Sequence, residues 1–169
     1  MQKGFTLIEL LIVIGIIAVL ATSVLLILNP AQILAETRDI QRLSDLNAVR
    51  DAINLYLVIT TNSNLNVFGG TCGISFWASF NGVSKPTQIN ATGGQAIFGL
   101  TPRAVNGTGW VPVNFASMLT GSPLAVLPQD PTPSMNGCST LSNPVNGGCF
   151  YLYVCNNIVK TYELDANLE

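Results

Sequence analysis

The feature that most constrains this chain is a long apolar stretch near its beginning. Residues 7–28 comprise 22 positions with a single charged residue, Glu9. At 1.5 Å per residue, a helix of this length spans about 33 Å, and the hydrocarbon core of a bilayer is about 30 Å thick. The rest of the chain holds no second stretch of this kind. The sequence therefore predicts one membrane-crossing helix, at the start of the chain.

Composition supports this placement and excludes several function classes. Charged residues make up 9% of the 169 residues, whereas a typical soluble domain has about 25%. The net charge of −2 provides no basic field that would attract nucleic acid. The chain has no histidine, which removes the commonest general base and the commonest metal ligand. We therefore expect no catalytic site, no cofactor and no metal site.

Four regions follow one another along the chain: a leader at residues 1–4, the apolar transmembrane helix at 5–28, an amphipathic helix at 29–60, and a globular, β-rich domain at 61–169 that is predicted to be exported. In the amphipathic region, apolar residues recur every three or four positions, which predicts one buried stripe. The stripe consists of Ile40, Leu43, Leu46, Val49, Ile53 and Tyr56 or Leu57. Charged residues such as Arg42 are assigned to the other helix faces.

Pro30 follows Asn29 at the junction of the two helical regions. A proline inside a helix removes one backbone hydrogen bond and usually produces a kink. We expect one continuous helix that is kinked at Pro30. Two separate helices, joined at Asn29 and Pro30, are the alternative.

Short extended runs bounded by turn residues predict strands at residues 74–80, 95–100, 149–155 and 158–164. Asn156 and Asn157, between the last two runs, suit a tight hairpin turn, because asparagine tolerates positive φ. Tyr151 and Tyr153 would share one face of the sheet and belong to its core. The expected fold is α+β, with a long N-terminal helix packed on a small C-terminal antiparallel β-sheet.

The four cysteines are Cys72, Cys138, Cys149 and Cys155. Their spacing matches no zinc site, and an even number in an exported domain predicts two disulfides. Cys149 and Cys155 flank a predicted strand and would lie roughly 20 Å apart, too far to be bridged. The preferred pairing is Cys138–Cys149 with Cys72–Cys155, and Cys72–Cys149 with Cys138–Cys155 is the alternative.

The residues before the apolar run have an unusual order. Positions 3–10 read K-G-F-T-L-I-E-L, so that the small residue Gly4 precedes the apolar run. In an ordinary secretory signal, the cleavage site follows a shorter apolar core of 7–15 residues. Cleavage between Gly4 and Phe5 would leave the apolar helix on the mature protein. It would also create a new amine at Phe5, four residues before Glu9.

Glu9 is the most informative residue of this segment. A carboxylate at the centre of a membrane helix costs roughly 2.5 kcal/mol or more, and less near its end. Glu9 is either a charge tolerated at the membrane interface or one half of an ion pair. We prefer the ion pair, with the terminal ammonium of an adjacent subunit as the cation, because no lysine or arginine occurs between Phe5 and Leu28.

The contiguous stretch G-F-T-L-I-E-L-L-I-V-I resembles the N-terminal prepilin signal of type IV pilins and type II secretion pseudopilins, and residues 38–56 resemble the second half of the pilin helix. The resemblance implies that a prepilin peptidase cuts between Gly4 and Phe5, that Phe5 is then N-methylated, and that Glu9 acts in assembly. It also implies the partners: other copies of the chain or related pilins, the peptidase and methyltransferase, and an inner-membrane assembly machinery.

The expected function is therefore that of a type IV pilus subunit and not of an enzyme. The subunit would be a single-pass membrane protein with its globular domain outside the cytoplasm, and would become part of an extracellular pilus after assembly. A subunit similar to the major pseudopilin of type II secretion is the alternative, and a monomeric membrane protein with an exported binding domain is a third reading. Major pseudopilins carry an aspartate-rich calcium loop, whereas Asp130 is the only acid between Ala52 and Tyr162, so calcium binding is not expected.

Overall fold

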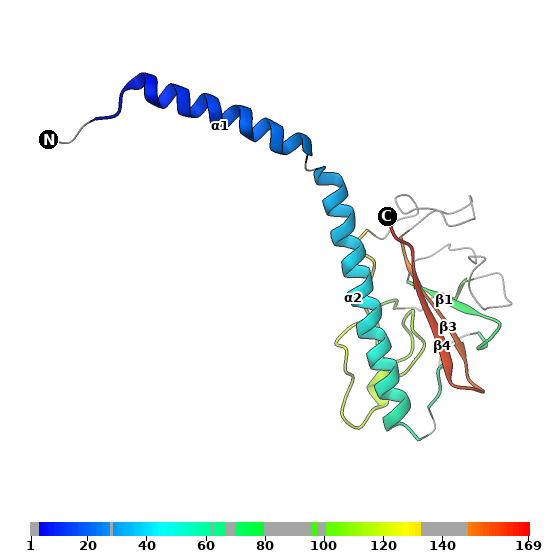
Figure 1. The fold of residues 1–169 in the computed structure, drawn as a ribbon. Helices are drawn as coiled ribbons and strands as arrows, with labels where there is room; N and C mark the ends of the chain where they lie inside the picture. Colours follow the sequence, from blue (N-terminus) through cyan, green and yellow to red (C-terminus); the bar gives the residue numbers. More distant parts are fainter. Residues whose placement is uncertain are drawn as a thin grey trace. The chain divides into compact units, whose positions relative to one another are not determined.

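The structure is a computed structural model that describes residues 4–27, 29–61, 63–66, 70–79, 96–97, 101–132 and 149–169. The chain divides into two compact units, Met1–Thr37 and Arg38–Glu169. The first unit holds helix α1 and the start of helix α2. The second holds the remainder of α2 and the sheet (Figure 1).

Helix α1 extends over Leu7–Ile27 and presents apolar side chains on all its sides. Residues 7–24 form a segment long and apolar enough to cross a membrane, and none of it is buried within the chain. The hydroxyl groups of its two hydroxyl residues form hydrogen bonds within the helix. Thr22 donates to the carbonyl of Val19 at 2.9 Å, and Ser23 donates to the carbonyl of Leu20 at 2.8 Å. Satisfied backbone and side-chain polar groups are what a helix needs in lipid.

Helix α2 extends over Pro30–Ile59, so the two helices are separate and the prediction of one continuous helix kinked at Pro30 is wrong. The reason lies in the residues that start α2. Asn29 caps the new helix, because its Oδ1 accepts a hydrogen bond from the Ala31 N–H at 3.2 Å. Pro30 then occupies the first helical position, where its missing N–H costs nothing and its fixed φ suits the helix.

The buried face of α2 also differs from the predicted stripe. Ile40 and Leu43 are exposed, whereas Arg42 is fully buried. The remaining buried residues of the helix are Val49, Ala52, Ile53 and Tyr56. Arg42 lies seven residues before Val49, which is two helical turns, and therefore on the same face. The apolar stripe was predicted correctly from Val49 onward and incorrectly before Leu46.

Within the described residues, the sheet has four strands in the order β2-β1-β3-β4. They are β1 Phe76–Ala78, β2 Ala96–Ile97, β3 Tyr151–Asn156 and β4 Thr161–Ala166. The pairs β1–β3 and β3–β4 are antiparallel, and the short β2 runs parallel to β1. The α+β class and the antiparallel core of the sheet agree with the prediction.

The turn between β3 and β4 is longer than the tight Asn156–Asn157 hairpin that was predicted. Asn156 pairs with Thr161 at the ends of the strands, so four residues form the loop. Asn156 Oδ1 accepts hydrogen bonds from the N–H groups of Ile158 and Val159 and thereby organises the loop. The positive φ falls on Lys160, at 55°, while Asn157 uses its Oδ1 to accept from the N–H of Leu65.

The main core lies between α2 and one face of the sheet, with residues 101–132 closing it. Tyr151 and Tyr153 of β3 are fully buried there, as predicted, and Trp77 of β1 packs edge-on against Tyr153. Trp110 donates its indole N–H to the Pro128 carbonyl at 2.9 Å, which satisfies the polar atom of a buried ring. The core cluster consists of Val49, Ala52, Ile53, Tyr56, Leu65, Trp77, Trp110, Val111, Val113, Phe115, Met118, Leu127, Tyr151, Tyr153 and Cys155.

Candidate processing segment and buried arginine network

The segment that carries the predicted cleavage bond precedes α1 in non-helical conformation. Gly4, Phe5 and Thr6 are outside any helix or strand, and all three are exposed. A Cβ atom placed on Gly4 would have no atom within 4 Å. No contact with the described residues therefore requires glycine at this position, and the backbone of the Gly4–Phe5 bond is open to an external enzyme.

Thr6 and Glu9 form a capping box at the start of α1, which was not among the predicted features. The Glu9 N–H donates to Thr6 Oγ1 at 3.3 Å, while Glu9 Oε2 lies 3.4 Å from Thr6 Oγ1 and 3.5 Å from the Thr6 nitrogen. The signal was present in the sequence as T-L-I-E, because a capping box places threonine three residues before glutamate. In the uncleaved chain, the Glu9 carboxylate thus faces its own helix start, where the helix dipole favours negative charge.

The surface of α1 contains a shallow apolar groove beside Gly15. It is lined by Leu11, Ile12, Gly15, Ile16, Val19 and Leu20. No atom would meet a Cβ placed on Gly15, so glycine here leaves space on the outside of the helix. Small residues allow close approach of another helix in a membrane or in an apolar bundle. The surface of α1 is therefore suited to contacts with other apolar helices.

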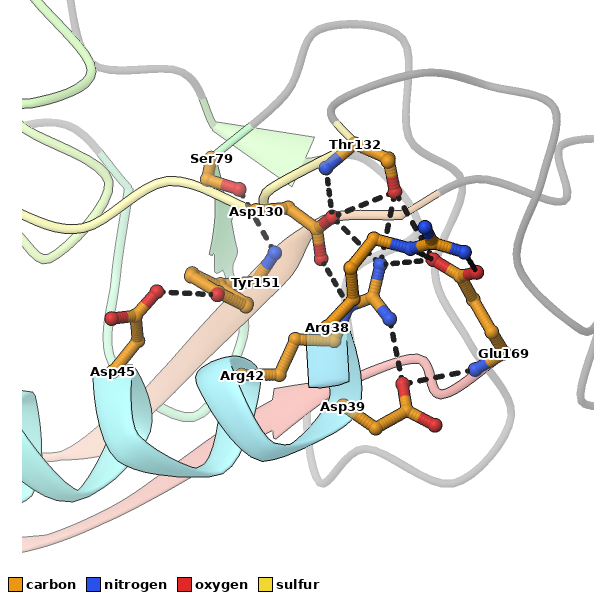
Figure 2. A network of polar contacts seen from close by, with 9 residues as sticks. All are labelled: Arg38, Asp39, Arg42, Asp45, Ser79, Asp130, Thr132, Tyr151 and Glu169. Carbon is orange, nitrogen blue, oxygen red and sulfur yellow. Dashed lines mark hydrogen bonds and ion pairs between the residues drawn. The ribbon is translucent and has the colours of Figure 1, made fainter. Parts of the chain in front are cut away.

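A second polar feature lies on α2 of the globular unit, centred on Arg42 (Figure 2). Its guanidinium donates to both carboxylate oxygens of Asp130, at 2.8 and 3.0 Å, in a bidentate pair. It also donates to Asp39 at 2.6 Å and to Glu169 at 2.9 Å. Thr132 completes the shell, with its hydroxyl 3.0 Å from the guanidinium. Arg42 thus connects its own helix with the Asp130 loop and the end of the described chain.

The network is buried at its centre and exposed at its margin. The side chains of Arg42 and Asp130 are both fully inaccessible, and that of Glu169 retains 13% of its surface. The pKa of Arg42 is raised, chiefly by its hydrogen bonds to Asp130, against the opposing effect of burial. At the margin, Arg38 pairs with Glu169 and lowers the pKa of that carboxyl to about 2. Two cations therefore face three carboxylates.

Asp45, on the same face of α2, connects this helix to the sheet through a hydrogen bond. The Tyr151 hydroxyl donates a hydrogen bond to Asp45 Oδ2 at 2.8 Å. The pKa of Tyr151 is raised, mainly by burial and to a smaller extent by this hydrogen bond. The backbone of Tyr151 in turn exchanges hydrogen bonds with Ser79: its N–H donates to Ser79 Oγ at 2.8 Å and its carbonyl accepts from the Ser79 N–H at 2.9 Å. Figure 2 shows these groups beside the arginine network.

The chemistry of this arrangement is structural. Arg42 is enclosed by acceptors, and a fully paired guanidinium has no remaining acid-base or nucleophilic role. Among the described residues, no group of three or more histidine, cysteine, aspartate or glutamate side chains is arranged to hold a metal ion. The network fastens α2, the Asp130 loop and the Glu169 segment together. The spacing of apolar residues does not reveal this network, because it places the charged Arg42 on an outer face of the helix.

One disulfide is described in full. Cys72 is bridged to Cys155, which closes a sequence separation of 83 residues and attaches the segment before β1 to β3. This bridge belongs to the preferred pairing and not to the alternative. Cys149 is also disulfide-bonded. Cys138, its predicted partner, lies outside the described residues.

The pairing of Glu169 gives a pH dependence with a defined sign. Because its folded pKa is about 2 and the ordinary value is 4.5, the ionised group stabilises the fold fully above about pH 4.5. This contribution is lost as the pH falls from about 4.5 toward 2. We expect the wild type to be more stable than Glu169→Gln at pH 6, with the difference shrinking toward pH 2.

Urea unfolding of the wild type and of Glu169→Gln across this pH range would measure the difference in stability. The pKa of Asp165 is also raised, mainly by burial, but Asp165 is present in both proteins and contributes equally to their pH dependence. A constant difference between pH 6 and pH 2 would contradict the role given to Glu169.

Comparison with known proteins identifies the first segment. Residues 1–25 match the family model of the prokaryotic N-terminal methylation motif, the prepilin-type signal of type IV pilins and pseudopilins. The match covers the predicted cleavage bond, the capping box and most of α1. No curated protein and no solved structure matches the chain.

Proposed function

We propose that this chain is the precursor of a type IV pilus subunit, which is cleaved between Gly4 and Phe5, N-methylated at Phe5 and polymerised into a surface filament. One observation carries the proposal. The methylation motif of residues 1–25 coincides with a helix that exposes apolar side chains on every side and has its one charge, Glu9, in the first turn. Such a helix needs an apolar environment, first lipid and then the helices of other subunits.

The globular unit supports an exported location. The Cys72–Cys155 disulfide and the bonded Cys149 fit an oxidising compartment outside the cytoplasm. In this proposal, α1 anchors the precursor in the membrane and residues 61–169 lie outside the cytoplasm. Its partners are other pilin subunits, the prepilin peptidase and methyltransferase, and the inner-membrane assembly machinery. Its role is structural and not enzymatic.

A type II secretion pseudopilin would use the same processing and assembly chemistry, because both kinds of subunit carry this signal. The two functions differ in whether the chain becomes part of a surface filament. Electron microscopy of surface filaments, combined with mass spectrometry of their subunit, would decide between them. Filaments that contain this chain starting at methylated Phe5 would support the pilus, and a monomeric membrane protein with an intact Met1 would contradict both.

The processing step can be tested at Gly4. We expect Gly4→Leu to leave uncleaved precursor in the membrane, because a peptidase that closes on this bond has no room for a bulky side chain. The fold should be unaffected by the substitution, because a Cβ on Gly4 has no described atom within 4 Å. Immunoblotting separates precursor from mature protein, and N-terminal mass spectrometry identifies the cut.

Gly15→Leu is the matched control, because Gly15 is equally open within the chain but lies outside the cleavage segment. It should be processed like the wild type. A wild-type protein cut at another position, such as after Ala21, would contradict the proposed processing.

A further inference from the structure

The capping box lies immediately after the proposed cleavage bond. The Gly4–Phe5 bond is in non-helical chain, Thr6 follows as the capping residue, and α1 begins at Leu7. The capping residue of a helix has non-helical backbone angles, and its side chain satisfies a backbone N–H of the first turn. The position at which α1 begins therefore depends on Thr6, two residues from the bond that must be cut.

The hydrogen bonds of Glu9 explain what the threonine hydroxyl prevents. The Glu9 N–H is shared between Thr6 Oγ1 at 3.3 Å and the Thr6 carbonyl at 3.2 Å. In a regular α-helix this N–H would bond to the carbonyl four residues back, that of Phe5. Removing the hydroxyl leaves the Glu9 N–H with the Thr6 carbonyl as its one acceptor. A shift of this N–H to its regular α-helical acceptor, the Phe5 carbonyl, is then no longer opposed by the hydroxyl, and the shift would draw the residue after the cleavage bond into the helix.

We propose that Thr6 is a positioning residue for precursor cleavage: its hydroxyl sets the start of α1 at Leu7 and so keeps the Gly4–Phe5 bond in non-helical chain, accessible to the peptidase. The proposal rests on the proposed processing of this chain. Cleavage itself adds one water across the bond and gives a Gly4 carboxylate and a Phe5 ammonium. If the Phe5 carbonyl accepted a helical hydrogen bond, the Phe5–Thr6 peptide group next to the scissile bond would be held in helical geometry and could not pair with a peptidase in extended form.

The two halves of the capping box have separate roles. The hydroxyl accepts from the Glu9 backbone N–H, a bond that any residue at position 9 can make. The Glu9 carboxylate reaches back to Thr6 over longer distances, 3.4 and 3.5 Å. Cleavage should therefore depend on the hydroxyl of Thr6 and be insensitive to the carboxylate of Glu9, while assembly depends on the carboxylate.

The experiment compares Thr6→Val, Thr6→Ser and Thr22→Val as full-length precursors in membranes that contain prepilin peptidase. Valine keeps the shape of threonine and removes the hydroxyl, whereas serine keeps the hydroxyl. Thr22→Val is the matched control, because it removes a hydroxyl from the same helix away from the cap. A cap is worth about 1 kcal/mol, or roughly fivefold in the population of the extended form.

We expect kcat/KM for cleavage to fall about fivefold in Thr6→Val through a higher KM, with Thr6→Ser and Thr22→Val unchanged. In detergent micelles, the ¹³C chemical shifts of Phe5 should move toward helical values in Thr6→Val, because its carbonyl would then accept the Glu9 N–H. Wild-type kinetics for Thr6→Val, or an equal loss in Thr6→Ser, would overturn the role of the hydroxyl. A wild-type precursor that is never cut at Gly4–Phe5 would instead overturn the proposed function itself.

Discussion

Replacing Glu9 by alanine is expected to leave membrane insertion and cleavage intact and to remove most of the surface filament. In the proposed filament, the Phe5 ammonium created by cleavage would lie in an apolar bundle, and no lysine or arginine occurs from Phe5 to Leu28. The proposed partner is Glu9 of a neighbouring subunit. Leaving one charge of a buried pair alone costs about 3–5 kcal/mol, which lowers incorporation a hundredfold or more.

The measurement expresses each variant as the sole copy and compares membrane level, processing and the yield of sheared fibres. Glu36→Ala is the matched control, because Glu36 is an exposed glutamate of α2 that contacts Gln32 of its own helix. Glu9→Gln separates two effects, since glutamine at this position of a capping box keeps the helix cap and loses the charge. It should assemble poorly. Wild-type fibre yield from Glu9→Ala would show that Glu9 is a tolerated interface charge.

Arg42→Ala is expected to destabilise the globular unit by about 3–5 kcal/mol. The substitution leaves the fully buried Asp130 carboxylate without its bidentate partner and removes the link to Glu169. The loss arises from an uncompensated buried charge, so a second substitution, Asp130→Leu, should restore part of the stability by removing that charge. Urea unfolding of the full chain in detergent, followed by the fluorescence of the buried Trp77 and Trp110, would measure both.

Arg50→Ala serves as the control on the same helix. Arg50 pairs with Asp51 at 3.4 Å, but both side chains are more than half exposed, and such pairs contribute about 0.5 kcal/mol or less. A loss for Arg42→Ala as small as that for Arg50→Ala would show that the network is not what fastens α2 to the Asp130 loop.

Local properties of the chain determined the apolar helix and the alternation of the last strands. Residues 7–27 are apolar except for Glu9, Thr22 and Ser23, so their helix could be predicted without knowledge of any partner. Tyr151 and Tyr153 share a face because side chains alternate along a strand. The capping box at Thr6 and the capped start of α2 at Asn29 were local as well, and attention to threonine–glutamate and asparagine–proline pairs would have found them.

The burial of Arg42 was decided by the tertiary structure. Before Leu46, α2 offers two faces for burial, one with Ile40 and Leu43 and one with Arg42 and Asp45. Hydrophobicity alone favours the first. The second prevails because Asp130 and Glu169, which are 88 and 127 residues away in sequence, meet the guanidinium and satisfy it. A charge is buried without a large cost only where other groups pair with it and accept its hydrogen bonds. The sequence does not show which distant residues the fold will bring to that helix face.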